Sequence, residues 1–214
     1  AKDPSLGGVI IVQGAEHPEW SEFLADFASL LSGSRWSTVL LNCSSDGSTP
    51  WITQLPEAIA QLRQAKNKRI VLIHYGSQLN TSLDYFSKPQ AKLINGLVLL
   101  SAYDEKSTAT KPYNVRFPIL DVIGQFDYDQ AKNQSANRQS QITGTEYLLV
   151  TIPGADHEYN YAKRLSVAFI GGWMDKLPEE VTESAPIKLS PPSVRADFYI
   201  EPVYSLDSQL VAVN

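Results

Sequence analysis

The chain has 214 residues, a formal net charge of −5 and one cysteine, Cys43. This length suits one α/β domain with its own core, and 43% hydrophobic and 19% charged residues are ordinary for a globular protein. The scattered basic residues argue against a nucleic-acid-binding face, and one cysteine excludes an intrachain disulfide framework and a cysteine-based metal site. No apolar run approaches the ~20 residues that span a bilayer.

Short apolar runs alternate with helical patterns along the chain, which predicts an α/β fold. The runs are nearly continuous in apolar character, as expected for parallel strands that are covered on both faces. We therefore predict a three-layer fold with a mostly parallel sheet and helices on both faces. Strands are expected at residues 7–12, 37–43, 69–73, 94–101, 117–124 and 147–154, and helices at 21–33, 55–66 and 162–177. In the last helix, Leu165, Phe169 and Trp173 are predicted to lie on one side.

The character of the chain changes near Pro178, where the helical pattern ends and prolines become frequent. We therefore divide the chain into a domain at residues 1–177 and an extended tail at 178–214. The run FYIEPVYSL in the tail is predicted to form an edge strand, where its proline is tolerated. We expect the tail to pack along its own domain or against a second copy as a homodimer.

Polar residues follow the predicted strands, at the edge where parallel α/β sheets bind ligands. The segments QGAEHPEW, HYGS, QFDYD and ADHEY hold all three histidines of the chain, His17, His74 and His157. This grouping favours a site at that edge. The run around His17 does not have a known metal-ligand spacing, so we expect no metal and no cofactor.

The order of strand, HYGS turn, strand, GQFD, strand and PGADH resembles the second half of an α/β-hydrolase, without the first two strands of that fold. The resemblance implies that Asp127 is the catalytic acid and His157 the catalytic histidine, since acid and histidine follow the nucleophile in that order. It also implies oxyanion-hole amides at Ala15, or its neighbour, and Gly76. The segments GAEHPEW and SRWSTVLLN further resemble a proteobacterial family of hydrolase-like proteins with undefined function. The match extends from residue 7 to 177.

The predicted nucleophile turn departs from the G-x-S-x-G pattern of that fold. Aligning IHYGS to the pattern places Ile73 at the first glycine, Tyr75 at the nucleophile and Ser77 at the last glycine. The turn needs small residues on both sides of its apex, and a phenol with a pKa near ~10 is a poor nucleophile. Ser77 is the alternative nucleophile, although a serine at this point also suits a helix cap. His17, His74 and Tyr103 are expected to line the same pocket, and the alternative for His74 is a ring that points into the core on the other face of the strand.

Two functions follow from these residues. The preferred one is a hydrolase-like fold with a degenerate site that binds a small molecule or a protein partner. The alternative is a serine-type esterase that uses Ser77, or Tyr75, with His157 and Asp127. A chain that begins at Ala1 fits a processed product, and a periplasmic location is favoured over a cytoplasmic one.

Overall fold

The computed structural model describes residues 5–14, 22–41, 51–89, 91, 94–105 and 112–179. The predicted edge strand and the rest of the tail after residue 179 lie outside these residues, and so do Ala15, His17 and Cys43. The six predicted strands and three predicted helices lie wholly or largely within them.

The centre of the fold is one sheet of six parallel strands in the order β2-β1-β3-β4-β6-β8. The chain forms β1, moves outward to β2 and then returns past β1 to β3, so the winding direction reverses between β1 and β3. All six predicted strands are confirmed. Their bounds are β1 (Gly7–Gly14), β2 (Trp36–Leu41), β3 (Ile70–Gly76), β4 (Gly96–Leu100), β6 (Ile119–Gly124) and β8 (Tyr147–Ile152).

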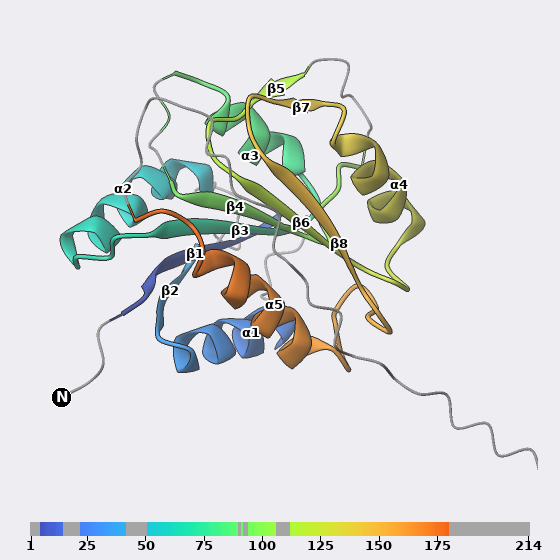
Figure 1. The fold of residues 1–214 in the computed structure, drawn as a ribbon, viewed down its shortest axis with the longest axis horizontal. Helices are drawn as coiled ribbons and strands as arrows, with labels where there is room; N and C mark the ends of the chain where they lie inside the picture. The colour runs from blue at the N-terminus through green and yellow to red at the C-terminus, as the bar shows by residue number, and fades with distance from the viewer. Residues whose placement is uncertain are drawn as a thin grey trace, which may run out of the picture.

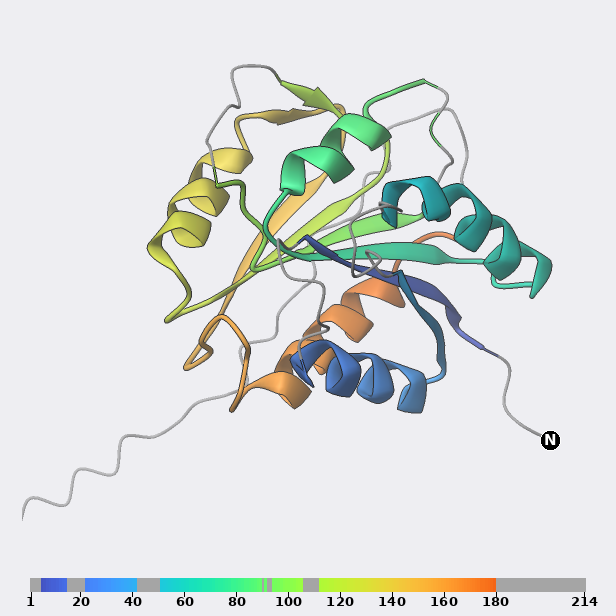
Figure 2. The ribbon, with the colours of Figure 1, turned by 180° about the vertical axis from the view of Figure 1, so that it is seen from behind.

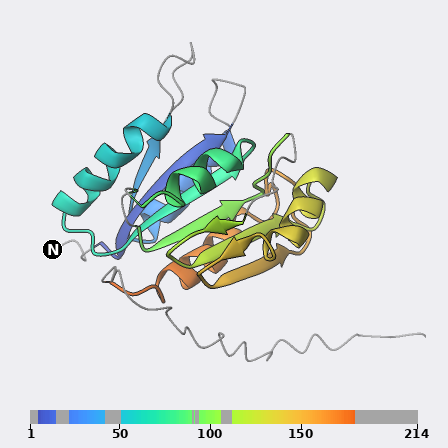
Figure 3. The same ribbon diagram turned by 90° about the horizontal axis from the view of Figure 1, so that it is seen from above.

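Helices cover both faces of this sheet (Figure 1). Two helices, α1 (Glu22–Gly33) and α5 (Lys163–Met174), lie together on one face. The opposite face is covered by α2 (Trp51–Gln64), α3 (Leu79–Phe86) and α4 (Asp129–Arg138), as the view from behind also shows (Figure 2). Seen from above, this second layer lies over the twisted sheet (Figure 3). The predicted three-layer α/β fold is confirmed.

Two apolar cores lie on opposite faces of the sheet, because alternate residues of a strand point to opposite sides. Val9 and Ile11 of β1 belong to one core, and Ile10 and Val12 belong to the other. Every residue of β3 is buried, which explains its continuous apolar run. The edge strands β2 and β8 are only partly buried. No helix in the described part of the chain is long and apolar enough to cross a membrane.

The buried side of α5 differs from the predicted one. Leu165 is 50% exposed and Phe169 is 44% exposed, so the side of α5 that carries them with Trp173 is not its buried side. A neighbouring stripe with the same four-residue spacing is buried instead, and its one polar member donates a 3.0 Å hydrogen bond to a carbonyl of its own helix. That bond makes burial of a serine inexpensive. The buried residues are Ser166, Val167, Ile170 and Met174.

Helix α4 and a small second sheet were not predicted. The segment DQAKNQSANR has almost no apolar residues, and its buried side consists of Ala131, Ser135 and Arg138. A helix with such a polar buried side shows no hydrophobic period. The second sheet pairs two short parallel strands, β5 (Tyr113–Asn114) and β7 (Ile142–Thr143), which are too brief to leave a pattern.

Candidate functional site

Asp127 and His157 lie side by side on loops that follow β6 and β8. The Asp127 Oδ1 atom is 2.7 Å from Nδ1 of His157. Asp127 also accepts hydrogen bonds from its neighbour's amide, Tyr128 N, at 2.8 Å and from the Ser101 hydroxyl. Burial opposes the charge of Asp127, but the hydrogen bonds from His157 and Ser101 outweigh burial and hold the pKa of this carboxyl below its usual value. The pair therefore has the geometry of an acid that orients a histidine.

Aromatic rings surround the His157 imidazole. The Tyr128 ring stacks on it with centroids 4.2 Å apart and an interplanar angle of 19°. The Tyr75 and Tyr103 rings lie 5.2 and 6.1 Å from it by the same measure. The His157 side chain is 13% exposed, so part of it still reaches solvent. The structure thus brings two predicted site residues, Tyr75 and Tyr103, to the histidine.

Two residues at the turn after β3 have a positive φ: Gly76, the last residue of the strand, at 80°, and Gln78, which precedes α3, at 58°. Tyr75, which the sequence alignment places at the apex, lies within β3 with an ordinary φ, and the chain turns only after it. A left-handed φ strains any side chain with a Cβ atom, which is why glycine suits this point. The apex is therefore one residue later than the alignment implies, and it has no side chain.

The next residue, Ser77, is bound to the end of β1 through both of its donors. Its amide and its hydroxyl each donate a 3.0 Å hydrogen bond to the Gly14 carbonyl. The approach of the two segments is so close that a Cβ atom on Gly14 would lie 1.6 Å from the Ser77 carbonyl oxygen. In α/β-hydrolases the amide that follows the nucleophile donates to the oxyanion. At this turn that amide already has a protein acceptor.

Neither hydroxyl that was considered as a nucleophile donates to a ring nitrogen of His157. The Tyr75 hydroxyl lies 3.4 Å from the His157 backbone carbonyl, and the Ser77 hydroxyl is committed to Gly14. Burial, together with Glu158 and Asp127, raises the pKa of the Tyr75 phenol well above its usual range. The phenol is therefore protonated at neutral pH.

His74 lies in the core on the other face of β3, where its ring contacts Trp51 with centroids 6.0 Å apart. Its Nδ1 and Nε2 atoms are each 2.8 Å from a partner, the Ser82 hydroxyl and the Ser77 carbonyl. Because a carbonyl only accepts, Nε2 holds the proton and Nδ1 accepts from Ser82. Burial lowers the pKa of His74 to about 4, against an opposing effect of the bond to Ser77. This neutral imidazole therefore supports the turn from beneath.

The loop after β4 lies at the same edge of the sheet as Gly76, Asp127 and His157, and we call this edge the rim. Tyr103 N donates to the Gly76 carbonyl at 3.0 Å, and the Tyr103 carbonyl accepts from Leu79 N at 3.2 Å. These bonds fix the turn to the loop that carries the Tyr103 ring. Of the other predicted site residues, Ala15 and His17 lie outside the described residues. Within the described residues, no group of three or more His, Cys, Asp or Glu side chains is arranged to hold a metal ion.

Two residues of the site were not found from the sequence. Ser101 sits at the end of β4 with a φ of 47°, and its hydroxyl contacts Asp127 and lies 2.8 Å from the Tyr159 hydroxyl. Tyr128 follows Asp127 directly and stacks on His157. The signal for Tyr128 was its position in QFDYD beside the proposed acid. Ser101 left no signal, because its partners come from distant strands.

No family model matches the sequence, and no curated protein matches it. Several solved structures share its fold. Est1E from Butyrivibrio proteoclasticus is 17% identical with a TM-score of 0.57, and the match covers 81% of this chain and 88% of that one. A structure described under LipS and LipT, two metagenome-derived lipolytic enzymes, is 12% identical with a TM-score of 0.62 and coverages of 81% and 95%. A Paleococcus ferrophilus monoacylglycerol lipase is 14% identical with a TM-score of 0.60 and coverages of 80% and 95%. The chain has the α/β-hydrolase fold.

Proposed function

We propose that this chain is a catalytically degenerate member of the α/β-hydrolase superfamily that binds a ligand or a protein partner at the former catalytic rim. One observation carries this proposal, which is the turn after β3. Gly76 has a φ of 80° at the apex, and the following amide of Ser77 donates to Gly14. A hydrolase of this fold needs a nucleophilic side chain at the apex and a free amide beside it. This turn offers neither.

The surface around His157 supports a binding role. Phe126 and Tyr128, on either side of Asp127, are 68% and 55% exposed. Exposed aromatic side chains supply large contact areas at low entropic cost, and they are enriched where proteins bind partners. The buried charge of Asp127 keeps the imidazole that stacks on Tyr128 oriented. A ligand would therefore contact aromatic faces and an oriented histidine edge.

The alternative is an esterase that uses Ser77 or Tyr75 with His157 and Asp127. It requires Ser77 to leave the Gly14 carbonyl and turn toward the histidine. It would also require Tyr75 to lose a proton that burial retains. Both changes cost free energy in the folded state, so degeneracy is the better explanation of this rim.

Labelling with a fluorophosphonate probe, followed by intact mass and peptide mapping, tests this proposal. Such a probe reacts with a hydroxyl that a neighbouring base has activated. We expect no adduct on the wild-type protein. We expect Gly76→Ser to gain an adduct at position 76, because it places a hydroxyl at the apex beside an existing acid–histidine pair. The gain should disappear in the double variant Gly76→Ser, His157→Ala.

Gly76→Ala is the matched control. A Cβ at position 76 meets one atom closely, the Gly14 carbonyl oxygen at 3.0 Å, and it is strained by the left-handed φ. Both variants have this strain, and only one has the hydroxyl. A wild-type adduct at Ser77 or Tyr75 that is lost in His157→Ala would contradict the proposal and favour the esterase. Thermal unfolding of each variant establishes that the compared proteins are folded.

The finer resemblance to a proteobacterial family of undefined function stays a prediction. The same holds for a bacterial source, a periplasmic location and a homodimer formed through residues 178–214. The division into a domain at 1–177 and a tail is likewise part of this proposal.

A further inference from the structure

A cavity lies on the face of the sheet that α3 and α4 cover. Its volume is 440 Å³, and it is lined by both helices, the loop after β4 and the short second sheet. Six of its lining side chains are carboxamides: Asn80, Gln130, Asn133, Gln134, Asn137 and Gln141. Four of these lie on α4, the helix whose exposed side has almost no apolar residues. The size falls within the range of small-molecule sites.

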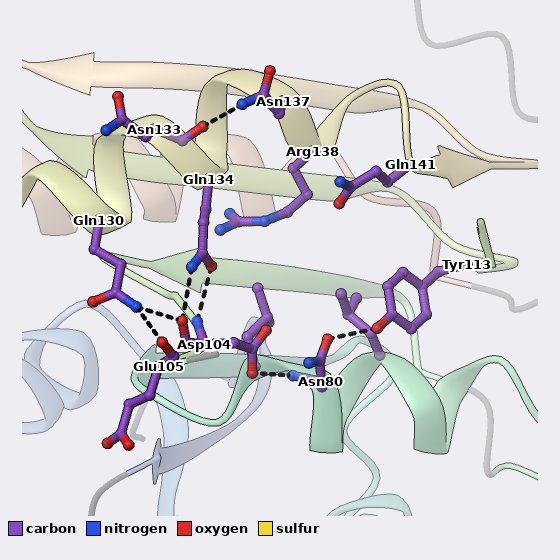
Figure 4. Close-up of a pocket in the computed structure, with 12 residues that line it drawn as sticks. Asn80, Asp104, Glu105, Tyr113, Gln130, Asn133, Gln134, Asn137, Arg138 and Gln141 are labelled. Atoms are coloured by element: carbon purple, nitrogen blue, oxygen red, sulfur yellow. Dashed lines mark hydrogen bonds between the residues drawn. The ribbon is translucent and has the colours of Figure 1, made fainter. Parts of the chain in front are cut away.

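Two of the carboxamides build the wall of the cavity. Gln134 donates to the Asp104 carbonyl at 2.7 Å and accepts from the Asp104 amide at 2.9 Å. Gln130 donates to the carbonyls of Asp104 and Glu105 at 2.6 and 3.0 Å. Figure 4 shows both side chains reaching from α4 to this loop. The loop after β4 is therefore held in place without a ligand.

Other carboxamides have hydrogen-bonding groups left for a ligand. The side chains of Asn133 and Gln141 make no hydrogen bond within the part of the chain that the structure describes. Asn137 uses one donor, at 2.8 Å from the Asn133 carbonyl, and its side-chain oxygen accepts no bond there. Each carboxamide offers two donors and an acceptor in one plane. A ligand that both donates and accepts at neighbouring positions would complement them.

The charge of the lining disfavours an anionic ligand. Asp104 and Glu105 contribute carboxylates. The Arg138 charge is already neutralised by a buried ion pair with Asp121, and its second arm donates to the Ala102 carbonyl at 2.7 Å. A phosphate or carboxylate would meet two negative groups and no free positive one. The lining therefore suits a neutral molecule.

Apolar groups complete the lining beside the second sheet. Tyr113 contributes a partly exposed aromatic ring, whereas Leu79 and Leu83 of α3, which also line the cavity, are each 2% exposed. The Tyr113 hydroxyl donates to the Asn80 side-chain oxygen at 2.5 Å, which fixes the ring relative to α3 (Figure 4). A sugar ring has an apolar C–H face and a border of hydroxyls that donate and accept. Both surfaces have a counterpart in this cavity.

We propose that the cavity between α3 and α4 is a binding site for a neutral saccharide. The proposal does not depend on the function of the rim. The two sites are adjacent, because Tyr103 contacts the His157 ring and the next residue, Asp104, lines the cavity. In this arrangement Asn133, Asn137 and Gln141 form hydrogen bonds with the sugar hydroxyls, and Tyr113 contacts the face of the sugar ring.

Two-dimensional ¹H–¹⁵N NMR tests this site, because side-chain carboxamide signals report directly on their own hydrogen bonds. The probes are methyl glucoside, N-acetylglucosamine and cellobiose, with glucose 6-phosphate as the anionic counterpart and a neutral tripeptide as the amide counterpart. We expect a neutral saccharide to shift the carboxamide signals of Asn133, Asn137 and Gln141. The double variant Asn137→Ala, Gln141→Ala should weaken that binding about tenfold, which is about 1.4 kcal/mol.

Gln139→Ala is the matched control, since Gln139 is an exposed carboxamide at the end of the same helix and does not line the cavity. It should leave the affinity unchanged. Tyr113→Ala should also weaken binding, whereas Tyr113→Phe should retain the ring contact. The proposal is overturned if no neutral saccharide shifts these signals, or if the double variant binds as tightly as the wild type. Tighter binding of glucose 6-phosphate or of the tripeptide at the same carboxamides would equally overturn it.

Discussion

The rim of this sheet has two sides that use their polar groups differently. On the side of β6 and β8, Asp127 and His157 form a 2.7 Å pair, and part of the histidine reaches solvent. On the side of β1 and β3, the amide and hydroxyl of Ser77 both donate to Gly14, and His74 is buried beneath them. One side therefore presents chemistry to a ligand, and the other satisfies its groups internally. Fold alone does not distinguish these outcomes, because one fold hosts many functions.

The contact between Gly14 and Ser77 should give the largest effect. Gly14→Ala places a Cβ 1.6 Å from the Ser77 carbonyl oxygen and 2.6 Å from its carbon. These backbone atoms directly follow the last β1–β3 pair, and the oxygen is also hydrogen-bonded to the buried His74. We expect a loss of about 4 kcal/mol in the free energy of unfolding. Urea denaturation followed by circular dichroism measures it.

Gly33→Ala is the control for this substitution, since a Cβ at the end of α1 meets no atom within 4 Å. It should change stability by less than about 1 kcal/mol. Equal stability of the two variants would mean that the turn after β3 rearranges at little cost. The β1–β3 side of the rim would then be no more rigid than the β6–β8 side.

His74, buried beneath the turn after β3, should make the free energy of unfolding fall in moderate acid. Its pKa is about 4 in the folded protein and about 6.5 when unfolded, so the unfolded state binds the proton more readily. The stability from the neutral imidazole is complete above pH ~6.5 and is lost as the pH falls toward ~4, which amounts to roughly 3 kcal/mol. His74→Gln retains a donor and does not titrate.

We therefore expect the free energy of unfolding of His74→Gln to vary less than that of the wild type across this pH range. Urea denaturation at a series of pH values gives both curves. Parallel curves would show that His74 binds a proton equally well in the folded and unfolded states. That result would contradict the effect of burial beneath the turn.

Asp127 should give a smaller effect in a lower pH window. Its folded pKa lies below the ordinary value of ~3.9, so its contribution is present above that value and is lost as the pH falls through the folded pKa. Asp127→Asn should cost about 1.5 kcal/mol at neutral pH, because hydrogen bonds to a charged group are replaced by weaker ones. The difference from the wild type should shrink in stronger acid, as thermal unfolding would show. If the stability difference between Asp127→Asn and the wild type persists at low pH, the Asp127 side chain stabilises the protein through packing and not through its charge.

The order of elements was accessible from the sequence. Nearly continuous apolar runs such as GGVIIV and RIVLI predicted buried parallel strands, and the structure confirms all six. The periodicity also located α1 and α5. It did not identify the buried stripe of α5, which joins a hydrogen-bonded serine to Val167, Ile170 and Met174. It also missed α4, because the buried side of that helix is small and polar.

The site depended more on tertiary structure. The spacing of GQFD and PGADH after two strands was enough to predict that Asp127 and His157 share a rim, because parallel strands end at the same edge. The apex of the turn was not determined by the letters HYGS. The alignment placed the apex at Tyr75, whereas β3 continues through Tyr75 to Gly76 and the positive φ lies at Gly76. The aromatic rings around His157 and the carboxamide cavity arise from segments far apart in sequence, so only the packing of the fold brings them together.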